Sequence, residues 1–311
     1  SAKAGQYNCV KILTVLTYYR PHVSGLTIYV ERLARALAGR GHAVTVLTSQ
    51  YDRALPRREE LDGVRVVRVP VVARVSKGVL MPTIGLVASK LVAVHDALSL
   101  HLPQLDASGI ARRARLLRKP TVLTYHSDLT LPISPVSAMV ERVVDVGNHV
   151  AARLSNVLCA YTEDFARHSR LLSAYMAKGR YILPPVDMPV VQPAAASAWA
   201  ARHGLDAGTL VIGVAGRLAA DKGIEDLLEA LPRLLAAHPG LRVIHAGPVE
   251  DVIGEERYRR RLAPMLGHFA DCYTFLGTLA PEEMAHFFYN CDVHVLPSIN
   301  STETFGLVQI E

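Results

Sequence analysis

The sequence predicts an α/β protein made of two Rossmann-like, doubly wound parallel-sheet domains that face a common cleft. Three observations support this fold class. The chain has 311 residues, half of them hydrophobic, which is enough for two sizeable cores. It opens with a strand, a polar loop, a helix and a second strand, which is the β-α-β order of a parallel sheet. After a proline-rich segment the same order begins again.

The first domain is expected to span residues 1–185. Its opening strand is the apolar run VKILTVLTYY, and RPHVSGL separates it from a helix. The apolar stripe of that helix is formed by Leu26, Val30, Leu33 and Leu37. Gly39 and Gly41 end the helix, and AVTVLTS is the next strand. Further strands are expected at GVRVVRVPV, PTVLTYH and NVLCAYT, with a helix around residues 136–154.

The second domain is expected to span residues 186–311, after the prolines of LPPVDMPVVQP interrupt the pattern. TLVIGVAG is predicted to be a strand and RLAADKG a loop. The helix that follows has an apolar stripe formed by Ile224, Leu227, Leu228, Leu231, Leu234 and Leu235. LRVIHAG, YTFLGTL and DVHVLPS are the remaining strands predicted.

Composition excludes several classes of protein. The four cysteines form no C-x-x-C pair, which argues against a disulfide framework or a thiolate metal site. No secretory signal or transmembrane pattern is found, so a cytoplasmic location is expected. The formal charge of +6 favours anionic partners. The chain has no zinc-finger spacing or basic run interleaved with aromatic residues, so nucleic-acid binding is not expected.

Polar loops follow several of the apolar strands. They are Ser24-Gly25, His126, Arg217–Lys222 and Ser298–Glu303. Ligands of open parallel sheets bind beyond the carboxyl ends of the strands. We therefore expect all four loops to point toward one cleft.

The stretch GRLAADKG is the first candidate site. Arg217 follows a buried strand directly after Gly216, and Lys222 precedes a helix. Two cations and the free N–H groups of a helix start can bind one anion, and a diphosphate suits this arrangement. Alternatively, the two residues are solvated loop charges. The G-x-G-x-x-G fingerprint is absent here and in the first domain, which argues against a dinucleotide-dependent dehydrogenase.

The chain ends with STETFGLVQIE, which contains two further candidates. A helix is predicted to begin near Thr304, with Glu303 at its start and the unpaired N–H groups of Thr304, Phe305, Gly306 and Leu307 facing the cleft. At ~1.5 Å per residue, Glu311 lies roughly 12 Å further along, so the two glutamates cannot share one proton or metal ion. They can contact the two ends of one elongated ligand. The alternative is an ordinary helix with two unrelated glutamates.

His126 in TYHSD ends a strand of the first domain, where its imidazole can donate a hydrogen bond to a ligand. The alternative is a histidine satisfied by a neighbouring carboxylate such as Asp128. The chain contains no H-E-x-x-H motif and no D-x-D pair, so no metal site is expected.

A peripheral membrane contact is a minor alternative for the first domain. The stretch from Gly78 to Val94 is apolar and is followed by the basic cluster Arg112, Arg113, Arg115, Arg118 and Lys119. Such a stretch is more often simply part of the core, and an acceptor groove is a further alternative. If the contact exists, we expect it at the inner face of the membrane.

With these motifs in place, the chain resembles family 4 (group 1) retaining glycosyltransferases of the GT-B fold. The resemblance extends through almost the whole chain. It rests on YYRPHVSGLTIYVERLARALAGRGHAVTVLT, LTYHSD, VAGRLAADKGIEDLLEA and VLPSINSTETFGLVQIE, the last of which matches the E-x7-E element of the family.

The resemblance implies transfer of a sugar from a UDP-, GDP- or ADP-sugar to a hydroxyl of a glycan, lipid-linked or small-molecule acceptor, with no cofactor and no metal. The second domain is then the donor domain and the first the acceptor side. Arg217 and Lys222 neutralise the diphosphate, Glu303 lies beside the donor sugar, and Glu311 holds the ribose. His126 contacts the donor sugar.

Under the same resemblance, Gly25 lines the phosphate and acceptor side. The chain departs from the family at this point, because it has Ser24-Gly25 where the family usually has two glycines. The family also continues past the second glutamate, so the second domain is expected to be incomplete here. A GT-B epimerase or phosphorylase, or a non-catalytic two-domain sugar- or nucleotide-binding module, is the alternative function.

Overall fold

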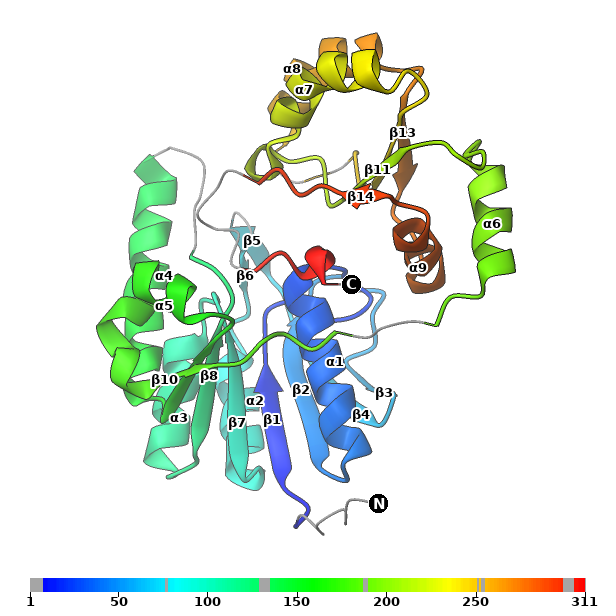
Figure 1. Cartoon of the computed structure of the whole chain (residues 1–311). Coiled ribbons are helices and arrows are strands. Elements are labelled where there is room, and N and C mark those ends of the chain that lie inside the picture. The colour runs from blue at the N-terminus through cyan, green and yellow to red at the C-terminus, as the bar shows by residue number, and fades with distance from the viewer. Residues whose placement is uncertain are drawn as a thin grey trace. The chain divides into compact units, whose positions relative to one another are not determined.

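The structure is a computed structural model that describes residues 8–75, 78–128, 135–186, 190–250, 252, 255–298 and 305–310, with the backbone alone at Val75, residues 135–137 and Leu307. The chain divides into two compact units, Ser1–Pro185 and Val186–Glu311. The division falls in the proline-rich segment. Each unit contains a parallel sheet covered by helices (Figure 1). The predicted α/β fold class is confirmed.

Among the described residues, the first unit has an eight-stranded sheet in the order β10-β9-β8-β7-β1-β2-β4-β3. Neighbouring strands are parallel, except that β3 pairs with β4 in the antiparallel sense. The strands are β1 Lys11–Val15, β2 Ala43–Gln50, β3 Arg58–Leu61, β4 Val64–Pro70, β7 Ala97–Leu102, β8 Thr121–Tyr125, β9 Val157–Ala160 and β10 Gly179–Tyr181. A separate hairpin pairs β5 Ala73–Val75 with β6 Gly78–Leu80.

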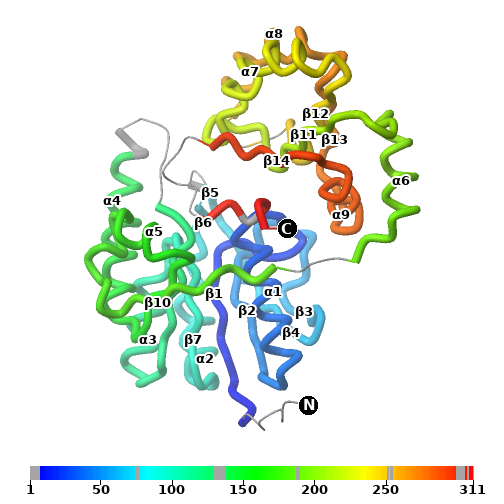
Figure 2. Tube along the Cα trace, viewed as in Figure 1, coloured from blue at the N-terminus to red at the C-terminus, as the bar shows by residue number. Residues whose placement is uncertain are grey.

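The helices of the first unit lie on both faces of this sheet. They are α1 Gly25–Gly39, α2 Ile84–Val94, α3 Ala107–Leu116, α4 Pro135–Leu154 and α5 Glu163–His168, with the 3-10 turn η1 Leu172–Lys178. The chain leaves β1 through α1 to β2 and later returns to β7 on the other side of β1 (Figure 2). Right-handed crossovers in these two directions place α1 on one face and the α2, α3 and α4 layer on the other.

The core under α2, α3 and α4 is formed by inward-facing residues of the central strands, including Leu13, Leu98, Leu100, Leu123 and Leu158. On the opposite face, α1 begins at a capped end: the Ser24 hydroxyl accepts a hydrogen bond from the Thr27 N–H at 3.2 Å. This cap fixes where the loop after β1 ends and α1 starts. Gly25 is therefore the first, exposed residue of α1.

The second unit has a four-stranded parallel sheet in the order β13-β12-β11-β14 among its described residues. Its strands are β11 Val211–Ala215, β12 Arg242–Ala246, β13 Tyr273–Gly277 and β14 Val293–His294. Its helices are α6 Pro193–Arg202, α7 Ile224–Ala237, α8 Glu256–His268 and α9 Pro281–Tyr289, with the 3-10 turns η2 Ala220–Lys222 and η3 Leu307–Gln309.

Alternate residues of β11 and β12 enter two different cores. Ile212, Val214 and Val243 pack with α7 and α8. Their neighbours Val211 and Ile244 pack with Trp199 of α6 and Phe287 of α9. The near-continuous apolar sequence of β11 is explained by this burial on both faces.

Two sequence expectations differ from the structure. The strand predicted at DVHVLPS is only two residues long, β14. The helix predicted from near Thr304 is wrong for the described part of that segment, which contains only the 3-10 turn η3. Gly306 has φ of +65°, a left-handed conformation that a right-handed helix cannot contain.

Candidate functional site

The loop between β11 and α7, residues 216–222, is held to the end of β12 by a close backbone approach. The Gly216 N–H donates to the Ala246 carbonyl at 2.8 Å, and the Leu218 N–H donates to the Pro248 carbonyl at 3.0 Å. Between these bonds, Gly247 packs directly on Gly216. A Cβ at Gly247 would lie 1.9 Å from the Gly216 carbonyl oxygen, which no side chain permits. This position therefore needs glycine.

His245 of β12 supports the same loop from inside the sheet. Its Nε2 lies 2.8 Å from the Gly216 carbonyl oxygen, and its Nδ1 lies 2.8 Å from the Tyr273 hydroxyl. Because a carbonyl only accepts, the proton is on Nε2, and Nδ1 accepts from Tyr273. Burial lowers the pKa of His245 to about 4, although the bond to Gly216 acts in the opposite direction. The imidazole is therefore neutral at pH 7.

Arg217 and Lys222 lie on either side of Asp221, a carboxylate within the same loop. Nη2 of Arg217 is 3.2 Å from Asp221 Oδ1, and Nζ of Lys222 is 3.8 Å from Asp221 Oδ2. The side chains of Arg217 and Lys222 are 37% and 19% exposed. The structure thus brings the two predicted cations together. Their charges and that of Asp221 sum to one net positive charge at the start of α7, an arrangement suited to an anion.

Asp221 was missed by sequence reasoning, although its position between the two cations in GRLAADKG was the available signal. The loop has two further anchors in α8 and the residue before it. The Ala220 N–H donates to Glu255 Oε2 at 3.0 Å, and the Ile224 N–H donates to the Tyr258 hydroxyl at 3.2 Å. The Tyr258 hydroxyl in turn donates to the carboxylate of Glu225.

The candidate residues in the terminal segment are only partly described. Glu303, Thr304 and Glu311 lie outside the described residues, so their predicted roles and separation stay predictions. Phe305 is half-buried and Gly306 is buried against Leu296. Leu307 begins η3.

His126 follows β8 and is almost fully buried. Its Nε2 lies 3.0 Å from Nδ1 of His101, and its Nδ1 is hydrogen-bonded to the Tyr161 hydroxyl. Burial, with a smaller effect of His101, lowers the pKa of His126 well below its usual range. The imidazole is therefore neutral and has partners at both nitrogens. Sequence reasoning missed His101, which lies on β7, and Tyr161, which directly follows β9.

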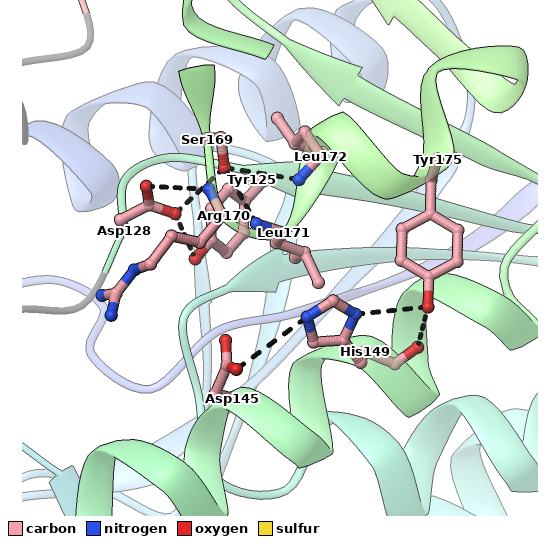
Figure 3. A network of polar contacts seen from close by, with 9 residues as sticks. All are labelled: Tyr125, Asp128, Asp145, His149, Ser169, Arg170, Leu171, Leu172 and Tyr175. Atoms are coloured by element: carbon pink, nitrogen blue, oxygen red, sulfur yellow. Dashed lines mark hydrogen bonds and ion pairs between the residues drawn. The ribbon is translucent and has the colours of Figure 1, made fainter. Parts of the chain in front are cut away.

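Asp128, considered above as a partner for His126, has other roles (Figure 3). Its Oδ1 accepts hydrogen bonds from the Tyr125 and Ser169 hydroxyls, each at 3.0 Å. Its Oδ2 accepts from the Arg170 N–H at 3.3 Å. Burial and the Asp128 charge raise the pKa of Tyr125, so its hydroxyl remains a donor. Asp128 thus ties the segment after β8 to the segment after α5.

Gly25 lies where the loop after β1 meets α1, beside a group of aromatic rings. Tyr18 stacks on His22 with ring centroids 4.8 Å apart, and Tyr51 meets both rings edge-on. Thr27 links this group to the helix, because its hydroxyl donates to the Tyr18 carbonyl at 3.2 Å. The loop is therefore ordered beside the exposed backbone of Gly25.

Within the ranges that the structure describes, no three His, Cys, Asp or Glu side chains lie together as a metal site requires. None of the helices described there is both long enough and apolar enough to span a bilayer.

Two protein families match the chain, one in each unit. Residues 24–185 match the glycosyl transferase 4-like domain, and residues 196–311 match the glycosyl transferases group 1 family. The chain belongs to the group 1 glycosyltransferases. The predicted family is confirmed, and with it the activity class of glycosyl transfer.

Individual relatives agree with this assignment. A D-inositol 3-phosphate glycosyltransferase of Stackebrandtia nassauensis is 31% identical over 92% of this chain and 68% of its own length. A GDP-mannose-dependent alpha-mannosyltransferase of Mycolicibacterium smegmatis is 25% identical over 94% of this chain and 75% of its own.

Solved structures resemble the fold. Sucrose-phosphate synthase from Thermosynechococcus elongatus has a TM-score of 0.71 at 20% identity, covering 97% of this chain and 78% of that one. Anabaena HepE in complex with UDP has a TM-score of 0.68 at 18% identity, covering 93% and 74%. The predicted GT-B fold is confirmed.

Replacing Gly247 tests the close approach to Gly216. Gly247→Ala must displace the Gly216 carbonyl and also strain a residue with φ of +141°, so we expect a loss of roughly 2–4 kcal/mol of unfolding free energy. Urea denaturation measures it. Gly267→Ala, at an open position in α8, is the control and should stay within about 1 kcal/mol of the wild type. Equal stability of the two variants would contradict the role of Gly247.

The neutral state of His245 predicts acid sensitivity. Below about pH 6.5 the unfolded chain takes up a proton at this imidazole, whereas the folded chain does so only near pH 4. The contribution of His245 to the free energy of unfolding is therefore complete above pH 6.5. As the pH falls toward 4, up to about 3 kcal/mol of it is lost. Unfolding free energies between pH 8 and 4 should decline less steeply in His245→Gln than in the wild type. His238→Gln, at an exposed position, is the matched control. An unaltered slope in His245→Gln would refute the assignment.

Proposed function

We propose that this glycosyltransferase takes its sugar from a nucleoside diphosphate donor and binds the donor diphosphate at the loop of residues 216–222. The observation that supports this most directly is the pairing of Arg217 and Lys222 around Asp221 at the start of α7. The names of relatives also favour it, since HepE was solved with UDP and with UDP-glucose, and a second relative is named for GDP-mannose.

Cleavage of a glycosyl-phosphate bond leaves negative charge on the departing diphosphate. Arg217 and Lys222, held in a loop fixed by Gly216 and Gly247, stabilise that charge without having to reorganise during the reaction. A bound diphosphate competes with Asp221 for both cations. We propose that this site needs no metal ion, and that the configuration of the transferred sugar is retained.

Residues outside this loop keep their proposed roles. Glu303 is assigned to the donor sugar and Glu311 to the ribose hydroxyls, while Gly25 is assigned to a ligand contact at the carboxyl edge of the first sheet. His126 keeps its assignment to the donor sugar, a contact of its ring that requires the ligand to displace His101 or Tyr161 from one nitrogen. For the acceptor, relatives named D-inositol 3-phosphate glycosyltransferase favour a small hydroxyl-bearing molecule over a glycan or lipid-linked acceptor.

Calorimetric titration with UDP, GDP and ADP, with magnesium and with EDTA, tests the donor site. We expect one nucleotide to bind with the same affinity in both conditions. Arg217→Ala and Lys222→Ala should each weaken binding about tenfold or more, or ~1.4 kcal/mol, because each substitution removes one of the two cations that bind the diphosphate. Arg260→Ala is the matched control, since Arg260 is an exposed α8 cation paired only with Glu256 among the described residues. Undiminished binding by Lys222→Ala would refute the proposal.

A peripheral membrane contact of the first unit is a separate proposal. Leu86 and Val94 of α2 and Leu116 of α3 are 71%, 61% and 82% exposed, and Arg115 beside Leu116 is exposed as well. Exposed apolar side chains accompanied by cations favour anionic lipid. We expect low-salt co-sedimentation with vesicles of phosphatidylglycerol and phosphatidylcholine, reduced severalfold by Arg115→Glu but not by Arg202→Glu in the second unit. Failure of the wild type to sediment would end the proposal.

A further inference from the structure

Helix α7, which follows the loop of Arg217 and Lys222, begins without a capping side chain. Its N-cap residue is Gly223, with φ of +59°. A Cβ at Gly223 would lie 2.3 Å from the Pro297 carbonyl oxygen, so this position needs glycine. Serine, threonine, asparagine and aspartate, which normally accept a hydrogen bond from the first N–H groups of a helix, are thereby excluded. Those N–H groups need an acceptor from elsewhere in the chain.

The acceptor for the first of these N–H groups comes from α8. The Ile224 N–H donates to the Tyr258 hydroxyl at 3.2 Å, and this bond is buried. Helices α7 and α8 lie side by side (Figure 1), and Ile224 and Tyr258 belong to the same core. Their exposed fractions are 1% and 6%. Because a buried N–H without an acceptor is costly, Tyr258 supplies the cap that Gly223 cannot provide.

Two further side chains orient the Tyr258 hydroxyl. It donates its proton to the carboxylate of Glu225. Arg261 Nη2 lies 2.7 Å from Glu225 Oε1, and the Arg261 guanidinium carbon lies 5.2 Å from the centre of the Tyr258 ring. Burial, and then the Glu225 carboxylate, raise the pKa of Tyr258, so the hydroxyl keeps its proton at pH 7. Since that proton is directed to Glu225, the hydroxyl oxygen is left to accept from Ile224.

The cap lies next to the loop of the proposed donor site. Ile224 is two residues after Lys222, and the Ala220 N–H, two residues before Lys222, donates to Glu255 Oε2 at 3.0 Å. Tyr258 and Glu255 therefore hold the backbone on both sides of Lys222. The first N–H of α7, expected from the sequence to be free for an anion, is already bonded. Binding of a diphosphate here depends on the side chains of Arg217 and Lys222 rather than on the Ile224 N–H.

We propose that Tyr258 is a positioning residue for the donor diphosphate: its hydroxyl caps α7 in place of an N-cap side chain and thereby fixes Lys222 where the diphosphate binds. The link to the ligand rests on the proposed function. The cap does not, because it concerns bonds within the second unit alone. If Tyr258 were needed only for packing, phenylalanine would serve equally well.

Three substitutions separate these roles. Tyr258→Phe removes the hydroxyl and keeps the ring. Tyr175→Phe is the matched control, because it removes a hydroxyl that donates to the His149 carbonyl at 3.2 Å in the first unit. Glu225→Gln removes the charge beside the cap, while its amide oxygen can still accept from Tyr258. Thermal unfolding of all three measures what each substitution does to stability alone.

The first readout is the Ile224 amide in ¹H–¹⁵N spectra recorded without ligand. Phenylalanine keeps the ring current of tyrosine, so a change at this amide reports the loss of the hydrogen bond. In Tyr258→Phe we expect the Ile224 proton to move upfield and to exchange with solvent at least about tenfold faster. The amide of Leu231, within α7, should be unchanged. An Ile224 amide that is the same in the wild type and in Tyr258→Phe would overturn the cap.

The second readout is calorimetric titration with UDP, GDP and ADP. For the nucleotide that the wild type binds, we expect affinity to fall about fivefold in Tyr258→Phe, because the loop must then be ordered on binding. Glu225→Gln and Tyr175→Phe should stay within about twofold of the wild type, whatever their melting temperatures.

Two results of this titration would overturn the positioning role. One is affinity that follows melting temperature across the variants. The other is an equal loss in Glu225→Gln and Tyr258→Phe, which would assign the effect to the Glu225 charge instead of the cap. A wild type that binds none of the three nucleotides would refute the proposed function and the link to the ligand, while the Ile224 amide would still decide whether Tyr258 caps α7.

Discussion

The contact between Gly247 and the carbonyl of Gly216 determines the geometry of the proposed donor site. It allows the end of β12 to lie against the start of the loop that follows β11, at a distance that a Cβ would prohibit. The His245 imidazole, which burial keeps neutral, donates a hydrogen bond from Nε2 to the same carbonyl. A loop fixed at its first residue in this way holds Arg217 in place before any ligand arrives.

Arg217 and Lys222 lie close together in the absence of a ligand, and the carboxylate of Asp221 makes this possible. Two cations brought to one loop repel each other, and the carboxylate between them offsets that repulsion. Both pairs are partly exposed, so their contribution to stability is small. The importance of these pairs is that they orient the side chains of Arg217 and Lys222. When an anion replaces Asp221 as their partner, both cations are available to bind it.

Much of the fold was predictable because its strands are buried on both faces. VIGVA is apolar throughout and RVIHA is apolar at three of its five positions, and such runs between polar loops indicate parallel sheets even in a single sequence. The loop of Arg217 and Lys222 was predictable for the same reason, since it directly follows the apolar run of β11 and therefore lies at the carboxyl end of that strand. The helix expected near Thr304 is wrong for the described part of the segment because Gly306 adopts a left-handed conformation, which the sequence permits at any glycine but does not specify.

The supporting residues of the sites were not predictable, and the reason is physical. His101 and Tyr161 become partners of His126 only through the register of β7, β8 and β9, and His245 meets Gly216 only through the pairing of β11 with β12. A single sequence shows each of these residues within an otherwise ordinary strand or loop. Their importance follows from contacts between residues 25 to 35 positions apart.

The most direct test of the diphosphate site is residue-resolved. Backbone amide ¹H–¹⁵N shifts would be followed while UDP, and separately uridine, is added to the chain. We expect UDP to shift the amides from Gly216 to Gly223 and uridine to leave them largely unchanged, because the loop recognises the phosphates. Shifts of equal size with uridine, or UDP shifts confined to other parts of the chain, would show that this loop is not where the diphosphate binds.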